Sequence, residues 1–187
     1  MAELNQVLQS LKSTTDYQQA SSLLSKAKIL LLKNNALTPS PQTSPDLLYA
    51  ARSIYEIGAL ATIRARNPDA FVRYYHQLAP FYDLPENVLP AQPSERNKIT
   101  GLYLLLLLVK GDYSGFHTEL EGLEMRGVQT GSPGGEDGDR FLMYPVRLER
   151  WLMEGSYDQV WRAMSKAEYP SEEFSVFHDV SSHLPHQ

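Results

Sequence analysis

One stretch restricts the possible folds of this sequence more than any other: the apolar run from Leu102 to Val109, LYLLLLLV. In a helix, this run presents hydrophobic side chains on every side, so the helix must be enclosed by neighbours in the chain or by another subunit. A helix that spans a membrane needs about 20 apolar residues, and this run is much shorter. The run therefore predicts a buried central helix rather than a membrane span.

A second helix is predicted directly after the central one, across the turn Lys110-Gly111-Asp112. Its apolar residues fall on one helical face and its polar residues on the other. The apolar set is Tyr113, Phe116, Leu120 and Leu123, and the polar set is His117, Glu119, Glu121 and Glu124. A buried helix followed by an amphipathic one is typical of the inner and outer layers of stacked helical hairpins.

The composition excludes several classes of protein. The 187 residues include no cysteine, so neither a disulfide framework nor a thiolate metal site can form. The formal net charge of -5 repels phosphate backbones, so a nucleic-acid partner would need a local basic patch. Residues 1–12 lack the apolar core of a signal peptide, so we expect a soluble intracellular protein with no membrane contact.

Capping residues and prolines divide the rest of the chain into helices. The periodicity predicts a first helix that ends near Ser13, a second from Tyr17 to Lys33 and a third from Pro45 to Ala65. Six further helices are predicted to begin at Pro68, Ser94, Tyr113, Tyr144, Tyr157 and Pro170. The predicted N-caps are Asp16, Ser44, Asn67, Asp112 and Ser156. Pro80 is grouped with three later prolines in an irregular segment, and no strand signal is found.

Two segments are predicted to be exposed loops. Residues 37–45, LTPSPQTSP, contain three prolines, and Thr38, Ser40 and Ser44 each precede one. Proline-directed phosphorylation there is an alternative to a plain spacer, which we favour. Residues 127–140, GVQTGSPGGEDGDR, are rich in glycine and acidic residues and are expected to be mobile. This second loop has neither the ending of a phosphate-binding loop nor the ligand spacing of an EF-hand.

Three helix starts share one pattern: a capping residue, a tyrosine, and an apolar residue three positions after that tyrosine. They are Asp16-Tyr17 with Ala20, Asp112-Tyr113 with Phe116, and Ser156-Tyr157 with Val160. This recurrence favours a solenoid of hairpins over a closed bundle, although the separations are irregular. We therefore predict an all-α fold in which antiparallel helical hairpins form one repeat domain over residues 1–187.

The sequence contains no recognisable catalytic or metal-binding pattern. His117 and Glu121 share a helical face, but such a pair without a third ligand more often makes a hydrogen bond. No His-Glu-x-x-His motif, no Gly-x-Ser-x-Gly elbow and no thiol is present, so a hydrolase would lack an obvious nucleophile. We predict no enzymatic activity, no cofactor and no metal.

One basic and aromatic cluster is noticeable. Arg64, Arg66 and Arg73 lie close in sequence to Tyr74 and Tyr75. Basic side chains interleaved with aromatic rings can bind single-stranded RNA. A protein contact or a plain surface is the favoured interpretation, and RNA binding is kept as an alternative.

Four motifs between Glu56 and Val160 resemble a known family. They are EIGALATIRARNPDAFVRYYHQL at Glu56–Leu78, GLYLLLLL from Gly101, FHTELEGL at Phe116–Leu123 and PVRLERWLMEGSYDQV at Pro145–Val160. These motifs are similar to the PCI-domain family, and within it to the small non-ATPase subunits of the 26S proteasome lid. The resemblance implies a right-handed stack of helical hairpins, followed by a winged helix and a terminal helix, with no catalysis of its own.

The resemblance also implies partners and a location. They are other subunits of the proteasome lid, with the ubiquitin-receptor subunit as a further candidate, in the cytoplasm and nucleus. Because the chain ends at Gln187, we expect only the N-terminal helical part of such a subunit, without the winged helix. Neither predicted loop is a feature of the family. A paralogous PCI complex, translation initiation factor 3 or the COP9 signalosome, is the main alternative.

The family motifs indicate candidate contact residues. His117, Glu119 and Glu121 lie in the HTELE run, and Arg150, Glu154 and Tyr157 lie in the last motif. Each of them is expected either to contact a partner or to hold a hairpin turn. For Glu154 and Tyr157, holding a turn is at least as plausible as a contact.

Overall fold

The computed structural model describes residues 2–91, 94–128, 139–166 and 168–177. Throughout these ranges the regular secondary structure is helical, which confirms the predicted all-α fold class. The chain divides into two compact units, residues 1–96 and 97–187. That residues 1–187 form a single repeat domain stays a prediction. Of the described helices, none is both long enough and apolar enough to cross a membrane.

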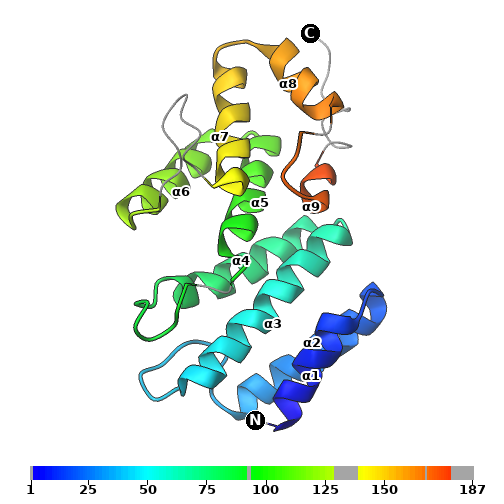
Figure 1. Cartoon of the computed structure of the whole chain (residues 1–187), viewed down its shortest axis with the longest axis vertical. Helices are drawn as coiled ribbons and strands as arrows, with labels where there is room; N and C mark the ends of the chain where they lie inside the picture. The colour runs from blue at the N-terminus through cyan, green and yellow to red at the C-terminus, as the bar shows by residue number, and fades with distance from the viewer. Residues whose placement is uncertain (1, 92–93, 129–138, 167, 178–187) are drawn as a thin grey trace. The chain divides into compact units, whose positions relative to one another are not determined.

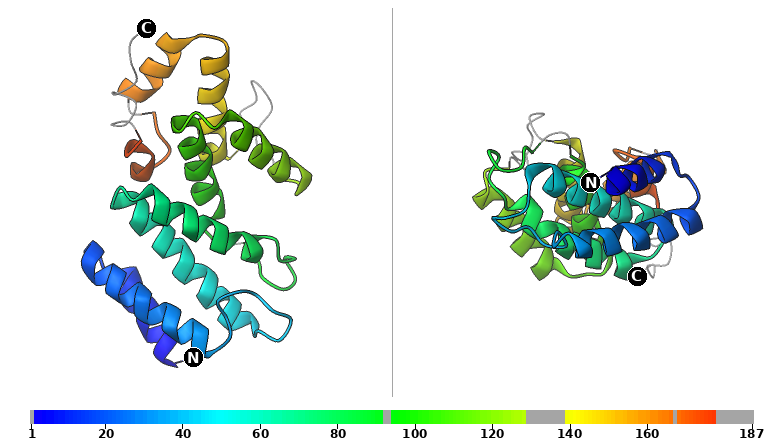
Figure 2. Two further views of the ribbon diagram at one scale, coloured as in Figure 1. Left: turned by 180° about the vertical axis from the view of Figure 1, so that it is seen from behind. Right: turned by 90° about the horizontal axis from the view of Figure 1, so that it is seen from below.

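The first unit consists of two helical pairs. Its helices are α1 (Ala2–Ser13), α2 (Tyr17–Lys33), α3 (Pro45–Arg64) and α4 (Pro68–Tyr82). Helix α3 is central, because it packs against α4 on one side and against both α1 and α2 on the other (Figures 1 and 2). Asp16 and Asn67 cap α2 and α4 as predicted, since their side chains accept hydrogen bonds from the N–H groups of Gln18 and Ala70.

Helices α3 and α4 approach closely at Gly58. A Cβ at this position would lie 2.5 Å from Cε1 of Tyr74, so no larger residue fits without a shift of the tyrosine ring. The Tyr74 ring belongs to a buried aromatic group in which Tyr55 lies 6.3 Å from Tyr74 and 5.7 Å from Phe81, measured between ring centroids. The small residue Gly58 thus allows α4 to come close to α3.

The second unit contains α5 (Arg96–Val109), α6 (Tyr113–Met125), α7 (Arg140–Met153), α8 (Tyr157–Ser165) and the short α9 (Glu172–Ser175). Helix α5 is the apolar run from which the sequence argument began. Its leucines at positions 102 and 104–108 are all buried, which confirms the prediction of an enclosed helix. Arg96 of α5 donates its backbone N–H to Ser94 Oγ, so this serine lies at the helix start as expected.

Three helical pairs are joined by the same short connection. The first helix ends in a residue with positive φ, namely Arg66 after α3, Gly111 after α5 and Gly155 after α7. In each case the following residue donates its N–H to a carbonyl of the last turn, as Ser156 does to Trp151 at 2.8 Å, and occupies the N-cap of the next helix. The feature that recurs in these three hairpins is therefore a backbone turn, not a buried tyrosine.

The recurring sequence pattern predicts that a tyrosine locks each hairpin turn against the preceding helix, but these tyrosines are not buried. Tyr17, Tyr113 and Tyr157 are all exposed, so this part of the predicted pattern is wrong. The apolar residues three positions later behave as expected in two cases, because Ala20 and Phe116 are buried. Backbone hydrogen bonds already close the turns, so the tyrosine rings are not needed there.

Two proline positions were also predicted wrongly. Pro80 lies inside α4, and Pro145 lies inside α7, which begins at Arg140 rather than at Tyr144. Asp139 is the N-cap of α7, since its Oδ1 accepts the N–H of Phe141 at 2.9 Å. Each of these prolines removes one backbone hydrogen bond of its helix, yet the helix continues through it. The proline was therefore a poor marker of the first residue.

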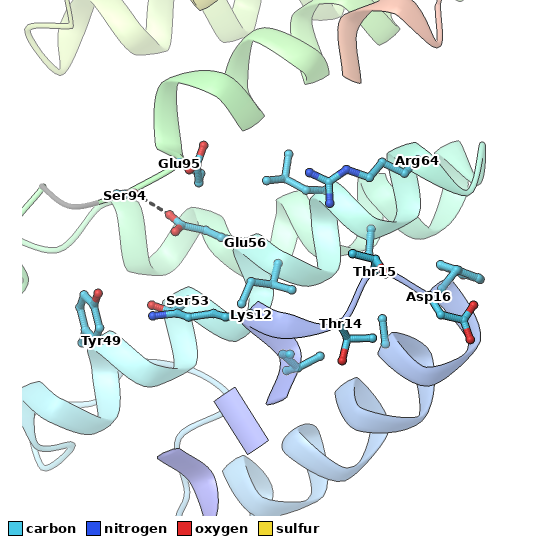
Figure 3. Close-up of a pocket in the computed structure, with 16 residues that line it drawn as sticks. Lys12, Thr14, Thr15, Asp16, Tyr49, Ser53, Glu56, Arg64, Ser94 and Glu95 are labelled. Atoms are coloured by element: carbon cyan, nitrogen blue, oxygen red, sulfur yellow. Dashed lines mark hydrogen bonds between the residues drawn. The ribbon is translucent and has the colours of Figure 1, made fainter. Parts of the chain in front are cut away.

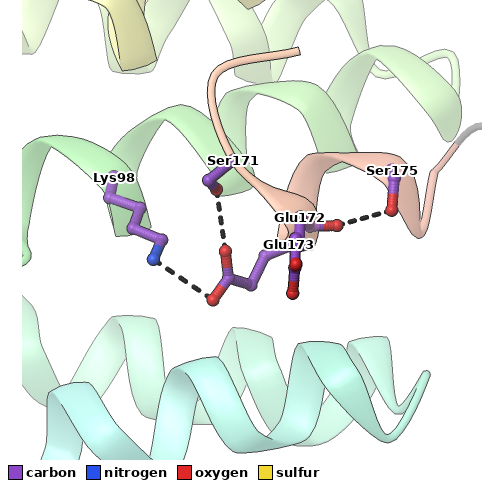
Figure 4. Close-up of polar contacts among 5 residues, drawn as sticks. All are labelled: Lys98, Ser171, Glu172, Glu173 and Ser175. Carbon is purple, nitrogen blue, oxygen red and sulfur yellow. Dashed lines mark hydrogen bonds and ion pairs between the residues drawn. The ribbon is translucent and has the colours of Figure 1, made fainter. Parts of the chain in front are cut away.

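Helix α9 is fixed to α5 by a buried ion pair. Lys98 Nζ lies 3.1 Å from Oε1 of Glu173, and the side chains are only 15% and 5% exposed. Ser171 Oγ also lies within hydrogen-bond distance of Glu173, 2.7 Å from Oε2 (Figure 4). Phe174 is buried beside this pair, where its ring stacks on Phe141 at 6.1 Å between centroids.

The structure describes the first predicted loop in full and the second only in part. Residues 37–44 connect α2 to α3, and Pro45 is the first residue of α3. Tyr55 donates its hydroxyl to the carbonyl of Leu37 at 3.0 Å, which ties the start of this loop to α3. Of the segment 127–140, residues 129–138 lie outside the described residues. The predicted mobility of both loops stays a prediction.

Candidate protein-protein interface

Of the residues predicted from the HTELE run, His117 and Glu119 contact other side chains of the chain, whereas Glu121 is exposed. His117 Nε2 lies 3.2 Å from Oε1 of Glu149, so this histidine links α6 to α7. Glu119 Oε1 lies 3.6 Å from Arg126 near the end of its own helix. Glu121 is exposed. His117 therefore has a structural contact, and Glu121 is the member of the run that is most open to a partner.

The second predicted group surrounds the turn between α7 and α8. Glu154 is the C-cap of α7, and the turn is closed by backbone hydrogen bonds from Gly155 to Leu152 and from Ser156 to Trp151. Arg150 is half-buried, whereas Tyr157 is 62% exposed. Tyr157 thus contributes little to the turn, and its ring is presented to the solvent.

Tyr157 is one of three large apolar side chains that are exposed at and after the end of α7. Met153 at the end of α7 is 55% exposed, and Trp161, one helical turn beyond Tyr157, is 50% exposed. The adjacent arc of α8 faces inward, because Val160 and Met164 line a small apolar cavity with residues of α5 and α7. We call Met153, Tyr157 and Trp161 the α8 stripe.

The sequence argument missed the α8 stripe. The apolar periodicity of residues 157–164 predicts that Tyr157 and Trp161 are buried together with Val160 and Met164, and the exposure of both rings shows that this prediction is wrong. Tyrosine and tryptophan are enriched in the energetic centres of protein interfaces. Large apolar side chains on one exposed helix face are therefore a stronger signal for a protein contact than the charged residues of the HTELE run.

The arginine cluster does not converge on one surface. Arg64 lines a groove beside α1, Arg73 lines a different pocket beside α2, and Arg66 lies at the turn after α3. Tyr74 and Tyr75 are each only 7% exposed, so their rings cannot serve as an open stacking platform for bases. RNA binding by this cluster stays an untested alternative that the geometry does not favour.

The groove beside α1 is the larger of the two and has a volume of about 380 Å³. It is lined by charged groups of both signs, including Lys12, Arg64 and Glu95 (Figure 3). The lining residues, all within the described part of the chain, include no histidine. The groove therefore has charged rims of both signs.

A buried carboxylate lies at the edge of this groove. Glu56 Oε1 accepts hydrogen bonds from Ser94 Oγ at 2.5 Å and from the Tyr82 hydroxyl at 3.0 Å. Burial raises the pKa of Glu56, and the hydrogen bonds together with the charge of Arg52 offset part of that rise. Burial also raises the pKa of Tyr82 well above its ordinary value, so its hydroxyl stays protonated and can donate. Glu56 thus has a structural role, because it holds the segment before α5 onto α3.

Within the residues that the structure describes, no three His, Asp or Glu side chains are placed so that they could hold a metal ion. The pair His117 and Glu121 does not acquire a third ligand, and His117 instead contacts Glu149.

Comparison with known proteins shows which family the chain resembles. Residues 95–180 match the model of the CSN8/PSMD8/EIF3K family. The chain is similar to this family over that segment. The matched segment starts just before α5 and includes the HTELE run, the turn between α7 and α8, and the α8 stripe.

Individual relatives extend the match to almost the whole chain. The chain is 35% identical to the 26S proteasome regulatory subunit RPN12 of Saccharomyces cerevisiae, over 96% of this chain and 65% of the relative. It is 37% identical to the 26S proteasome non-ATPase regulatory subunit 8 homolog A of Arabidopsis thaliana, over 88% of this chain and 58% of the relative. The chain thus spans less than two thirds of the length of these relatives.

Proposed function

We propose that this protein is a non-catalytic structural subunit of the lid of the 26S proteasome regulatory particle. In this role it supports lid assembly, and thereby ubiquitin-dependent protein degradation, through contacts with other proteins. The similarity to proteasome regulatory subunits over 96% of the chain is the observation that carries the proposal. Other lid subunits are the proposed partners, with the ubiquitin-receptor subunit as a further candidate, in the cytoplasm and nucleus.

The geometry supports a contact role rather than catalysis. The larger groove has no histidine, and its buried carboxylate is engaged in holding the segment before α5. The α8 stripe, by contrast, exposes large apolar side chains of the kinds that anchor protein interfaces. We therefore propose the α8 stripe, flanked by Arg150 and Glu154, as the main contact surface, with Glu121 on α6 as a second candidate.

The names of the relatives help to decide between the proteasome and the two paralogous complexes. The family model covers subunits of the COP9 signalosome and of translation initiation factor 3 as well. The relatives from Saccharomyces cerevisiae, Arabidopsis thaliana and Schizosaccharomyces pombe are all named as 26S proteasome subunits. This agreement supports the proteasome over the two paralogous complexes.

Affinity capture of the tagged protein from its own cells tests the proposal. We expect mass spectrometry to identify proteasome lid subunits in the captured material. Recovery of signalosome or initiation-factor subunits in their place would move the protein to one of the paralogous complexes. Recovery of none of these complexes would contradict the role altogether.

A pair of variants locates the contact. Tyr157→Ala together with Trp161→Ala removes two rings of the α8 stripe, and we expect it to reduce the recovery of lid subunits at least tenfold. Asp158→Ala together with Gln159→Ala is the matched control, because both residues are exposed on the same helix. Equal recovery with both variants would show that the contact surface lies elsewhere.

A further inference from the structure

A second pocket of the first unit is lined by positively charged side chains and by no described carboxylate. It has a volume of about 240 Å³ and is formed by side chains of α2, of α4 and of the end of α3. Two of its lining residues are cationic, Lys28 and Arg73, and its lining residues, all within the described part of the chain, include no aspartate or glutamate. The nearest carboxylate in sequence to Arg73, Asp69 in the first turn of α4, is exposed and does not line the pocket.

Both cations lack an acidic partner among the described residues. Lys28 Nζ lies 4.2 Å above the ring centroid of Tyr74, a cation-π contact that positions the ammonium group without neutralising it. Tyr74 itself is fixed by its packing against Gly58 and Tyr55. Arg73 is exposed at the pocket rim, one residue before Tyr74. The pocket therefore carries two positive charges that no described carboxylate balances.

The neutral side chains of the pocket offer further donors. Asn67 uses Oδ1 to accept the N–H of Ala70, which leaves its amide NH₂ group for a ligand. Ser21 and Gln77 add a hydroxyl and a second amide. The hydroxyls of Ser25 and Thr62 are already used within their own helices, where they donate to the carbonyls of Ser21 and Ala59. Donors thus outnumber acceptors, which suits an anion with several oxygen atoms.

We propose that this pocket binds a phosphomonoester dianion, presented as phosphoserine or phosphothreonine by a partner protein. A phosphorylated side chain carries about -1.5 to -2 charges near pH 7, which matches the two cations, whereas a carboxylate supplies only one charge and two oxygens. Nucleic acid is less favoured, because Lys28 covers the Tyr74 ring and Tyr17 is the one exposed aromatic side chain of the described lining, whereas single strands stack successive bases on several rings.

Fluorescence anisotropy with a labelled peptide tests the proposal. The probe is Gly-Ser-Gly-phosphoserine-Gly-Ser-Gly, compared at low salt with its unphosphorylated form. We expect the whole chain to bind the phosphorylated peptide, inorganic phosphate to compete with it, and the unphosphorylated peptide not to bind. Lys28→Gln together with Arg73→Gln should weaken binding at least tenfold, because each cation contributes charge-assisted hydrogen bonds.

A charge-matched variant separates the pocket from the net charge. Lys12→Gln together with Arg64→Gln removes the same two charges from the larger groove, where Glu56 and Glu95 also lie, and should leave binding within about twofold of the parent. In NMR spectra the phosphopeptide should shift the side-chain amide signals of Asn67 and Gln77. Circular dichroism checks that both variants retain their helical content.

Several outcomes would overturn the proposal. These are no binding of the phosphopeptide at low salt, equal binding by the Lys28 and Arg73 variant, or an equal loss in the control variant. An oligouridine RNA that binds more tightly than the phosphopeptide and depends on the same two residues would replace it with a nucleic-acid site. The assay contains no proteasome component, so its failure would leave the proposed lid role standing.

Discussion

The α-carbon of Gly101 on α5 lies directly against the backbone carbonyl group of Phe141 on α7. A Cβ at position 101 would overlap the carbonyl oxygen and would lie 2.9 Å from the carbonyl carbon. That oxygen would normally accept the N–H of residue 145 in the helix, but residue 145 is Pro145, which has no N–H. The glycine and the proline therefore belong to the same close contact between the two helices.

Gly101→Ala should destabilise the protein by about 1–3 kcal/mol, because the new methyl group meets backbone atoms that can move only with α7. Gly122→Ala on α6 is the matched control. There the nearest atom to a new Cβ is an Arg126 nitrogen at 3.7 Å, so the better helix propensity of alanine should stabilise by about 0.5–1 kcal/mol. Urea unfolding measures both changes. A neutral Gly101→Ala variant would contradict the close contact.

The ion pair between Lys98 and Glu173 gives a second prediction. Glu173→Leu alone should cost about 3–5 kcal/mol, because it removes the Glu173 carboxylate from the largely buried Lys98 ammonium group. Adding Lys98→Met should recover much of that loss, since an apolar pair requires no desolvation of charge. Glu172→Ala is the control, because this neighbouring side chain is exposed, and it should change stability by less than about 0.5 kcal/mol. Losses that simply add in the double variant would contradict coupling between the two residues.

Sequence reasoning was most successful where interactions among residues close in sequence determine the structure. Asp16, Asn67 and Asp112 were correctly predicted as caps, because a short polar side chain before a helix bonds the first-turn N–H groups whatever surrounds it. The enclosed helix α5 was predicted because a run that is apolar on all sides has no stable exposed arrangement. Neither conclusion needed knowledge of the neighbouring helices.

Features that depend on which helices meet could not be predicted. The pattern of α8 is apolar over a wide arc, and only packing decides that Val160 and Met164 turn inward while Tyr157 and Trp161 face solvent. The cationic pocket is a similar case. Lys28 and Arg73 belong to different helices, and only the packing of the first unit brings them to one site without a carboxylate.

Arg66 gives a third prediction, because it occupies the positive-φ position that is glycine in the two equivalent turns. Its φ is 55°, against 72° for Gly111 and 71° for Gly155. Arg66→Gly should therefore stabilise the protein by about 0.5–1 kcal/mol, since a side chain disfavours this conformation. Gly111→Ala, where no neighbouring atom lies within 4 Å, should destabilise by about 1 kcal/mol for the same reason. Thermal unfolding that moves both variants in the same direction would contradict the argument.

The buried Glu56 gives a fourth prediction, on pH dependence. Its pKa is raised above the ordinary 4.5, chiefly by burial. The folded protein therefore binds the Glu56 proton more tightly than the unfolded chain does. The resulting stabilisation is complete below pH 4.5 and is lost as the pH rises through the raised pKa. Relative to Glu56→Gln, which cannot ionise, the parent protein should lose stability over the window that begins near pH 4.5.

Urea unfolding of the parent and of Glu56→Gln, at half-unit steps from pH 4 to pH 7, measures this difference. Tyr82→Phe supplies an internal check, because the Tyr82 hydroxyl bonds Glu56 Oε1 at 3.0 Å and lowers the pKa of the carboxyl group. Without that bond the pKa should rise further, so the loss of stability should move to higher pH. A stability difference between parent and Glu56→Gln that stays constant across the whole range would show that Glu56 titrates alike in the folded and unfolded states.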